Sequence, residues 1–247
     1  MKRVDVALVE RGLCESREKA QRAVLAGQVR INQQPARKPS DKIRDTDELS
    51  LEAPERYVSR GGYKLEHGLR HFALEVSGMT VLDVGASTGG FTDCVLQHGA
   101  RRVFAVDVGR GQLAWKLRQD PRVIVMENIN ARGLSPAHFG AAFVPFDLAV
   151  IDCSFISLRK ILPPVIALLR SNSRVLALIK PQFEAGKAEA DKGAGVISDP
   201  AIHDRVLQEL REFVGTLPAT HWLGVTPSPL PGPAGNREFL TLLEKAG

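Results

Sequence analysis

Residues 80–90 read Thr-Val-Leu-Asp-Val-Gly-Ala-Ser-Thr-Gly-Gly, an apolar run that ends in an acid and a glycine-rich turn. A helical pattern follows from Phe91 to His98. This order predicts a buried strand whose carboxyl end opens into a glycine loop and then into a helix. Glycine at these positions would let the backbone approach a bound ligand closely.

The spacing of these glycines indicates which ligand to expect. It differs from the G-x-G-x-x-G pattern of dinucleotide binders and is closer to the D-x-G-x-x-x-G-G loop of S-adenosylmethionine enzymes. Further along, Val103-Phe-Ala-Val106 ends at Asp107, where a carboxylate would meet a ribose. A structural turn with incidental glycines is the alternative, and Asp107 favours the cofactor. The expected S-adenosylmethionine site, with Asn130 near the adenine, comprises Asp83, Gly85, Ala86, Ser87, Thr88, Gly89, Gly90, Phe91, Asp107, Val108, Asn130 and Asp152.

Apolar strand patterns alternate with helical patterns from residue 79 onward. This alternation predicts an α/β fold, a doubly wound, mostly parallel Rossmann-like sheet with helices on both faces. Ligands bind such sheets at the carboxyl ends of the strands. The expected strands are 79–84, 102–107, 122–127, 146–152, 174–180, 220–226 and 237–243, and the expected helices lie near 89–98, 111–118, 159–169 and 201–214.

Composition restricts the class of protein. The 247 residues are 44% hydrophobic and 25% charged, which is ordinary for a soluble globular protein. No signal peptide is expected at the amino end, and no apolar run approaches the roughly 20 residues that span a bilayer. Cys14, Cys94 and Cys153 are dispersed without a C-x-x-C pair, which fits a reducing compartment and argues against structural zinc. We therefore expect a cytoplasmic protein with no metal site and no membrane contact.

The positive charge is concentrated in the first segment of the chain. Residues 1–44 hold eleven Lys and Arg residues against five acids, so the rest of the chain is slightly negative within a total of +5. A polyanion bound at this segment is the natural inference. The alternative is that the charges only form a solvated helix face.

Two short helices and a small sheet are predicted within this segment, which makes a compact α+β module. Its sequence resembles the S4 RNA-binding domain, through Arg3-Val-Asp5-x-x-Leu8, Gly12-Leu13, Ser16-Arg17-x-x-Ala20, Gly27-x-Val29 and Asp47-x-Leu49. The resemblance implies binding of structured RNA, and a phosphate is favoured near the amino end of the second helix. Ala53-Pro-Glu-Arg56 looks like a linker, so we expect an S4-like domain at 1–55, a linker at 56–62 and a methyltransferase domain at 63–247. The expected RNA-binding residues are Arg3, Ser16, Arg17, Lys19, Arg22, Lys38 and Arg60.

Charged residues stand at strand ends that a doubly wound sheet would bring together. Asp152 and Lys180 each close an apolar run, Glu238 opens the last strand, and Lys64 lies on the helix that enters the sheet domain. One such residue alone is most simply a solvated terminus, whereas several beside a cofactor loop indicate a site. Methyl transfer to a ribose hydroxyl needs a base and an in-line geometry. A lysine can be that base only when its pKa is lowered, which a neighbouring cation and partial desolvation both favour.

These motifs resemble the FtsJ-type 2′-O-ribose methyltransferases and, more closely, the TlyA family, which carries both methyltransferase and haemolysin names. The matching segments cover nearly the whole chain. The resemblance implies 2′-O-methylation of cytidine in ribosomal RNA or ribosomal subunits, with S-adenosylmethionine as cofactor, Lys64, Asp152, Lys180 and Glu238 as a catalytic tetrad and Lys180 as the base. The motifs are Ser59-Arg-Gly-Gly-Tyr-Lys64-Leu65, Asp83-Val-Gly-Ala-Ser-Thr-Gly-Gly90-Phe91-Thr92-Asp93, Asp107-Val-Gly-Arg-Gly-Gln-Leu113, Asp152-Cys-Ser-Phe-Ile-Ser-Leu158, Lys180-Pro-Gln-Phe-Glu184 and Gly235-Asn236-x-Glu238-Phe239.

Four other activities are alternatives to this one. Cys153 could attack cytosine before methylation at ring carbon five, although no proline precedes it. Methylation of an amino group would need Asp/Asn-Pro-Pro-aromatic where the chain has Asp152-Cys-Ser-Phe155. A membrane-lytic protein would need a secretion signal, a spanning segment or a long cationic amphipathic helix, and we expect none of these from the sequence. An RNA-binding assembly factor with an inactive enzyme domain remains as the fourth alternative.

Overall fold

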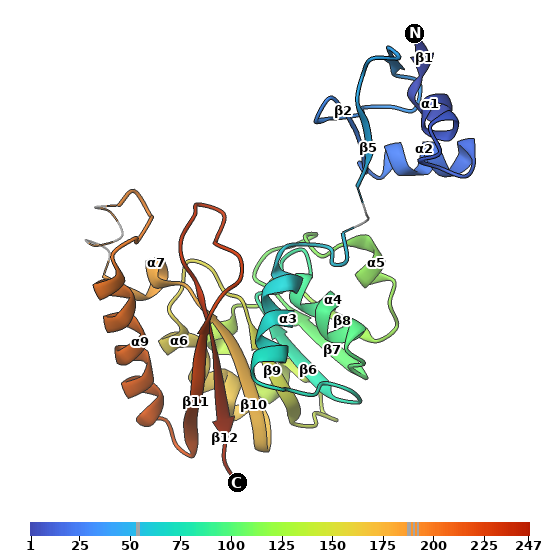
Figure 1. Ribbon diagram of the computed structural model, residues 1–247. Helices are drawn as coiled ribbons and strands as arrows, with labels where there is room; N and C mark the ends of the chain where they lie inside the picture. Colours follow the sequence, from blue (N-terminus) through green and yellow to red (C-terminus); the bar gives the residue numbers. More distant parts are fainter. Residues whose placement is uncertain (53–54, 187–188, 190, 192) are drawn as a thin grey trace. The chain divides into compact units, whose positions relative to one another are not determined.

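The chain forms two compact units, Met1–Arg56 and Tyr57–Gly247 (Figure 1). The computed structural model describes residues 1–52, 55–186, 189, 191 and 193–247. Ala53 and Pro54, near the end of the S4-like domain expected at 1–55, lie outside the described residues. Each unit has its own hydrophobic core and is considered by itself below.

The first unit is a small α+β module. Antiparallel pairing joins β1 to β4, and β2 lies between β3 and β5. Its core packs side chains of α1 and α2, among them Val4, Leu8 and Val24, against Val29 and Ile43 of the strands. The elements are β1 (Lys2–Arg3), α1 (Val4–Glu10), α2 (Arg17–Leu25), β2 (Val29–Ile31), β3 (Gln34–Pro35), β4 (Lys42–Ile43) and β5 (Leu49–Leu51).

A buried carboxylate ties the two helices of this unit together. Asp5 is fully buried and accepts hydrogen bonds from Arg3 (2.9 Å from both Nε and Nη2), Arg17 (3.0 Å) and Gln21 (2.9 Å). Chiefly because of the hydrogen-bonded Arg3 guanidinium, the pKa of Asp5 is held well below its usual range. Arg3 and Arg17 are therefore fixed by a partner inside the module, although both remain partly exposed.

The second unit is built on a seven-stranded sheet in the order β11-β12-β10-β9-β6-β7-β8. The pairs from β10 to β8 are parallel, and β12 is antiparallel to both β10 and β11. The expected doubly wound, mostly parallel sheet is therefore confirmed. The strands are β6 (Thr80–Val84), β7 (Arg102–Val106), β8 (Val123–Met126), β9 (Phe146–Ile151), β10 (Leu169–Ile179), β11 (Thr220–Pro227) and β12 (Phe239–Lys245).

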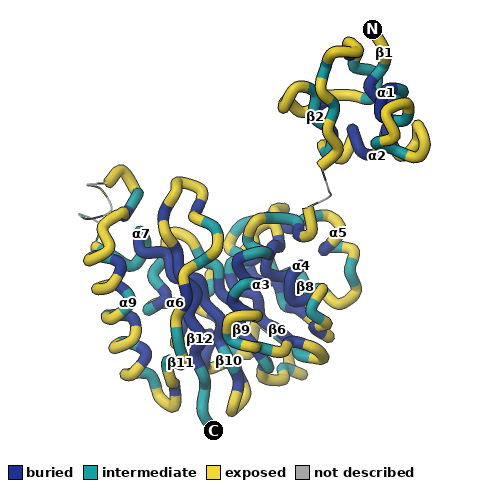
Figure 2. The backbone as a smooth tube through the Cα atoms, viewed as in Figure 1, coloured by how far each residue is buried: buried dark blue, intermediate teal, exposed yellow. Residues whose placement is uncertain are grey.

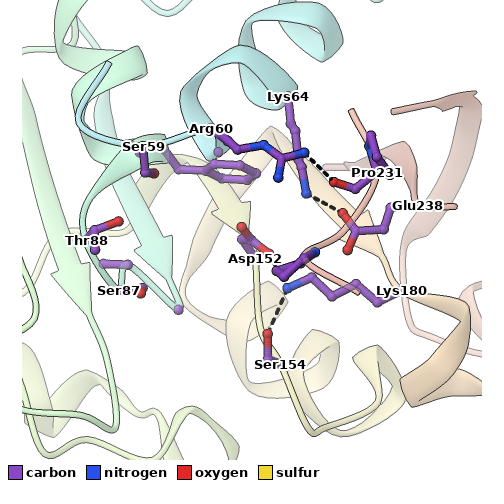
Figure 3. A pocket seen from close by; sticks show the side chains of 16 residues that line it. Ser59, Arg60, Lys64, Ser87, Thr88, Asp152, Ser154, Lys180, Pro231 and Glu238 are labelled. Atoms are coloured by element: carbon purple, nitrogen blue, oxygen red, sulfur yellow. Dashed lines mark hydrogen bonds and ion pairs between the residues drawn. The ribbon is translucent and has the colours of Figure 1, made fainter. Parts of the chain in front are cut away.

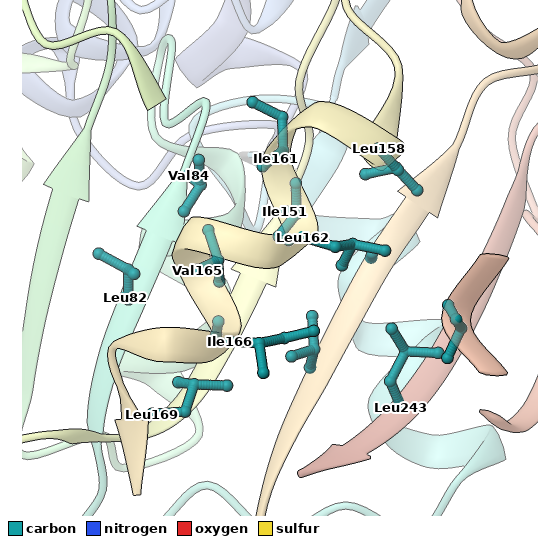
Figure 4. Close-up of a cluster of buried hydrophobic side chains, with 14 of the residues drawn as sticks. Leu82, Val84, Ile151, Leu158, Ile161, Leu162, Val165, Ile166, Leu169 and Leu243 are labelled. Carbon is teal, nitrogen blue, oxygen red and sulfur yellow. The ribbon is translucent and has the colours of Figure 1, made fainter. Parts of the chain in front are cut away.

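Helices cover both faces of this sheet, so its central strands are largely buried, whereas the edge strands β8 and β11 are partly exposed (Figure 2). Val81 packs on the side of α3 and α4, and Leu82, one residue later, packs against α6 on the other face (Figure 4). This alternation follows from the two-residue period of a strand. No described helix combines the length and apolarity needed to cross a membrane. The helices are α3 (Gly61–His71), α4 (Gly90–Gln97), α5 (Trp115–Arg118), η1 (Ala131–Gly133), η2 (Pro136–Phe139), α6 (Leu158–Ala167), α7 (Pro181–Glu184) and α9 (Pro200–Gly215).

Residues 57–62, expected as part of the linker, instead pack on the second unit. The side chain of Tyr57 is 2% exposed, and a Cβ added at Gly62 would lie 2.2 Å from its ring. The Val58 N–H donates to Asp93 Oδ2 at 2.9 Å. These contacts fix the chain before α3 begins. A short polar segment gives no periodicity from which such packing could be predicted.

Candidate functional site

A pocket of about 460 Å³ lies beside the carboxyl ends of β6, β9 and β10 (Figure 3). It opens where the strand order reverses between β6 and β9, the usual place of a ligand in a doubly wound sheet. Side chains from the glycine loop, from α3 and from the segment before β12 meet there. The lining residues are Ser59, Arg60, Gly61, Lys64, Gly85, Ala86, Ser87, Thr88, Gly90, Phe91, Asp152, Ser154, Lys180, Pro231, Pro233 and Glu238.

The glycine loop forms one wall of the pocket and has little space for side chains. Gly85 has φ +85°, and a Cβ there would lie 2.7 Å from the Asp152 carbonyl oxygen. A Cβ at Gly90 would lie 2.3 Å from Ser59 Oγ. The loop therefore packs tightly between the end of β9 and residue 59, and substitution at either glycine would push it out of place.

Asp83 lies beneath the loop rather than in the pocket lining. It is fully buried, and its Oδ2 accepts a 2.6 Å hydrogen bond from Thr92 Oγ1. Among the described residues its Oδ1 has no hydrogen-bond partner. Burial raises the pKa of Asp83 to about 7. The sheet thus holds a buried carboxyl group directly below the loop.

Other residues expected at the cofactor site do not line the pocket, and one of them, Asp107, instead holds the glycine loop through hydrogen bonds. Asp107 accepts hydrogen bonds from Ser87 N (2.8 Å) and Gly109 N (2.7 Å), so it fixes the loop from behind. Val108 is 71% exposed, and the Asn130 side chain accepts from Arg132 N in capping η1. The residues that the pocket does bring together are Gly85, Ala86, Ser87, Thr88, Gly90, Phe91 and Asp152, whereas Asp83, Gly89, Asp107, Val108 and Asn130 are not part of its lining.

Asp107→Ala should weaken binding of the cofactor without unfolding the protein. The substitution removes both acceptors that hold the Ser87 and Gly109 amides, and hydrogen bonds to a charged group contribute about 1.5–3 kcal/mol. We expect an affinity loss on the order of tenfold to a hundredfold by calorimetry, with Asp120→Ala, which removes an acid paired with Arg122 at the surface, as the matched control. Unchanged affinity in a folded Asp107→Ala variant would remove Asp107 from the cofactor site.

Two lysine–carboxylate ion pairs occupy the opposite wall. Lys64 Nζ lies 2.5 Å from Glu238 Oε2, and Lys180 Nζ lies 2.5 Å from Asp152 Oδ1 (Figure 3). Lys64, Lys180 and Glu238 are each less than one-tenth exposed. Four elements distant in sequence, α3 and the ends of β9, β10 and β12, therefore deliver one compact cluster of charges.

Cys153 is placed unfavourably for a nucleophile. Burial raises the pKa of its thiol to about 12, and the nearby Asp152 carboxylate acts in the same direction. Its Sγ lies 3.6 Å from the Val84 carbonyl oxygen, to which it donates. Both features disfavour the thiolate that attack on a cytosine ring would require.

The residues expected to bind RNA divide between the two units. On α2, Lys19 pairs with Glu15, which precedes the helix, and Arg22 pairs with Glu18. Ser16 caps α2 by accepting from Lys19 N at 3.2 Å. Lys38 has an exposed side chain. Arg60 belongs to the second unit, lines the pocket and donates to the Pro231 carbonyl at 3.0 Å.

Three polar or aromatic residues near the pocket escaped prediction from the sequence. Ser154 Oγ accepts from Lys180 Nζ at 2.9 Å. Phe155 is 90% exposed, adopts φ +62° and lies with its ring centroid 5.0 Å from that of Phe183. Glu184 accepts hydrogen bonds from Ser157 Oγ and Leu158 N at the start of α6. Ser154, Phe155 and Glu184 all belong to motifs that the sequence shows. Their roles were not predicted, because neither the left-handed backbone of Phe155 nor the hydrogen bonds of Glu184 to another segment can be recognised from a sequence pattern. Within the described residues, no cluster of His, Cys, Asp or Glu is arranged to hold a metal ion.

Each of the two units matches the model of a known protein family. The family model of FtsJ-like methyltransferases matches residues 57–245, and the S4 domain model matches residues 2–49. The chain is 46% identical over 98% of its length to the 16S/23S rRNA (cytidine-2′-O)-methyltransferase TlyA of Mycobacterium tuberculosis, and the match covers 89% of that protein. It is 40% identical over 96% of its length to Hemolysin A of Brachyspira hyodysenteriae, covering 98% of that protein. A solved structure of a candidate hemolysin from Streptococcus thermophilus has a TM-score of 0.75 and 47% identity, covering 99% of this chain and 88% of that one.

Proposed function

The chain belongs to the FtsJ-like methyltransferase family and carries an S4 domain, and on this premise we propose that it methylates the 2′-hydroxyl of a cytidine in ribosomal RNA. S-adenosylmethionine is the cofactor of this fold. The observation that carries the proposal is the pair of buried lysine–carboxylate contacts beside the glycine loop. This arrangement suits removal of a proton from a weakly acidic hydroxyl group.

The residues around the glycine loop fit S-adenosylmethionine. Gly85 and Gly90 line the pocket without side chains, so a ligand can approach their backbone closely. Asp107 and Asp152 lie beside the loop, and a ligand with cationic groups, such as a sulfonium and an ammonium, would favour the charged form of the buried Asp83 as well. The bound cofactor would supply a methyl group already activated for transfer.

Each member of the proposed tetrad has a distinct task. The ribose hydroxyl is a very weak acid, so Lys180 takes up its proton as the oxygen attacks, after the Lys180–Asp152 pair has given up one proton to solvent. Asp152 and Ser154 hold that amine in place. Lys64, held by Glu238, orients the ribose, so that the oxygen lies in line with the transferred methyl.

The position of Phe155 suits a nucleotide turned out of an RNA helix. It follows Ser154, which lines the pocket, yet its ring is 90% exposed. A bulky residue at φ +62° is strained, and such strain persists only where surrounding structure fixes it. We propose that the Phe155 ring stacks on the target base while its ribose enters the pocket.

Phe155→Ala should reduce methylation of RNA without changing cofactor affinity. Stacking of one base on an aromatic ring contributes about 1–3 kcal/mol, so kcat/KM for RNA should fall roughly 5- to 150-fold. Leu223→Ala, which truncates a partly exposed side chain on β11, is the control. If both variants methylate RNA like the wild type, Phe155 is not part of the substrate surface.

The first unit is proposed to recruit the substrate. Its excess of Lys and Arg favours the RNA backbone, and the S4 match supports ribosomal RNA or a ribosomal subunit as the partner. The reaction would then take place in the cytoplasm, where ribosomes are. Arg3, Arg17, Lys19, Arg22 and Lys38 are the proposed phosphate-binding residues.

Transfer of a labelled methyl group tests this function. Purified protein is incubated with ribosomal subunits, or with their extracted RNA, and with S-adenosylmethionine labelled in its methyl group. We expect label in RNA, retained on the nucleoside after digestion and released with the ribose when the base is cleaved. Label on a cytosine base, or no label in any RNA, would contradict the proposal.

A further inference from the structure

Two segments carry Asp152 and Lys180, and the sheet alone does not hold them together. They follow the neighbouring parallel strands β9 and β10, whose register pairs end at Ala177 and Ile151. Lys180 therefore stands three residues beyond the last position of β10 that pairs with β9, although β10 stays paired with β12 as far as Ile179. The distance between the Lys180 amine and the Asp152 carboxylate depends on contacts made after the strands end.

Such contacts occur at three successive places along the two segments. Lys180 Nζ donates to Ser154 Oγ at 2.9 Å. Next, the rings of Phe155 and Phe183 lie 5.0 Å apart between centroids. The segments thus run side by side away from the pocket, with each contact further from the reacting groups than the one before.

Glu184 makes the last of these contacts, through two hydrogen bonds. Its Oε2 accepts from Ser157 Oγ at 2.6 Å, and its Oε1 accepts from Leu158 N at 2.7 Å. Leu158 opens α6, so the carboxylate satisfies an amide that has no partner within the helix. Burial raises the pKa of Glu184, yet both of its oxygens are used by donors from the other segment. Glu184 itself does not line the pocket.

We propose that Glu184 and Ser154 are positioning residues that hold Lys180 at its working distance from Asp152 by fastening the segment after β10 to the segment after β9. This inference rests on the proposed function, because it assumes that Lys180 takes up the proton. Glu184 acts from a distance, through Ser157 and the start of α6, and Ser154 acts directly on the amine. Neither residue is needed to form the glycine loop that would hold the cofactor.

The test compares turnover with binding in three variants and one control. Glu184→Ala, Glu184→Gln and Ser154→Ala are measured beside Glu212→Gln, which alters an exposed carboxylate on α9 that is bonded to Gln208. For Glu184→Ala we expect kcat to fall about tenfold to a hundredfold, with the dissociation constants for S-adenosylmethionine and RNA within twofold of wild type. Glu184→Gln should recover part of kcat, because its amide oxygen can still accept from Leu158 N. Ser154→Ala should also lower kcat alone.

The outcomes separate positioning from a purely structural role. A kcat within threefold of wild type for both Glu184→Ala and Ser154→Ala overturns the inference. It is also overturned if Glu184→Ala loses cofactor affinity and melting temperature in parallel with kcat and Glu184→Gln recovers nothing. If Glu184→Ala does not fold, Glu184→Gln and Ser154→Ala decide the matter by the same criterion. Absence of methyl transfer by the wild-type protein would instead refute the proposed function.

Discussion

Lys180→Ala is expected to abolish methyl transfer while the protein still binds S-adenosylmethionine and RNA. General-base catalysis contributes about 10²–10⁴-fold, and this lysine is the proposed base. It lies 2.5 Å from Asp152 and is buried in the pocket, whereas the exposed Lys160 on α6 lies outside the pocket lining and serves as the control in Lys160→Ala. Single-turnover methylation with saturating RNA measures the effect.

Lys180→Arg separates a base from a positive charge at the same position. Arginine keeps the charge and the hydrogen bonds to a carboxylate, but it does not give up its proton in proteins. We expect this variant to be as inactive as Lys180→Ala. A rate within about tenfold of wild type for Lys180→Ala, equivalent to ~1.4 kcal/mol of barrier, would be too small for a base. Substantial activity of Lys180→Arg alone would mean that Lys180 acts through its charge.

Removal of residues 1–55 should leave a folded domain that binds S-adenosylmethionine but has lost most of its affinity for ribosomal RNA. The second unit retains its whole sheet, both of its cores and the buried Tyr57. The removed segment holds the positive excess of the chain. Because each phosphate contact contributes about 0.7–0.9 to the slope of log K against log salt, that slope should become flatter. Filter binding across a salt series, with calorimetry of the cofactor, makes the comparison.

Point variants in the first unit refine this experiment. Arg17 is bonded to the buried Asp5, so reversing its charge would disrupt the module as well as remove a phosphate contact. Neutral changes at exposed positions, Arg22→Gln and Lys38→Gln, avoid this problem and should reduce affinity and slope more gently. Equal affinity and slope for the truncated and the full-length protein would show that recognition belongs to the catalytic domain.

Much of the catalytic domain could be predicted from the sequence because its signals are local. An apolar run before Asp83 and glycines after it predict a strand and a loop, and Lys180 before Pro181 marks the end of a strand. The structure confirms the sheet and brings Lys64, Asp152, Lys180 and Glu238 to one pocket. The roles assigned to these residues remain predictions.

What could not be predicted depends on partners distant in sequence. In the sequence, nothing distinguishes Asp5 from an exposed acid. Its burial depends on hydrogen bonds from Arg17 and Gln21, which the fold brings to it. Residues 57–62 were expected to belong to a linker, but Tyr57 is buried in the second unit. Its ring packs where Gly62 has no side chain, and the sequence gives no sign of this contact. Ser154 and Glu184 lie within motifs of the sequence, yet the contacts that they make form only when the segments after two neighbouring strands lie side by side.

The most direct test is the chemical form of the methyl group in ribosomal RNA. The chain and its Lys180→Arg variant are expressed in a bacterial host that lacks this methylation, and nucleosides from purified ribosomal RNA are measured by mass spectrometry. We expect 2′-O-methylcytidine with the wild-type chain and none with Lys180→Arg or with the host alone. A methyl group on the cytosine base, or nucleosides identical in all three samples, would contradict the account.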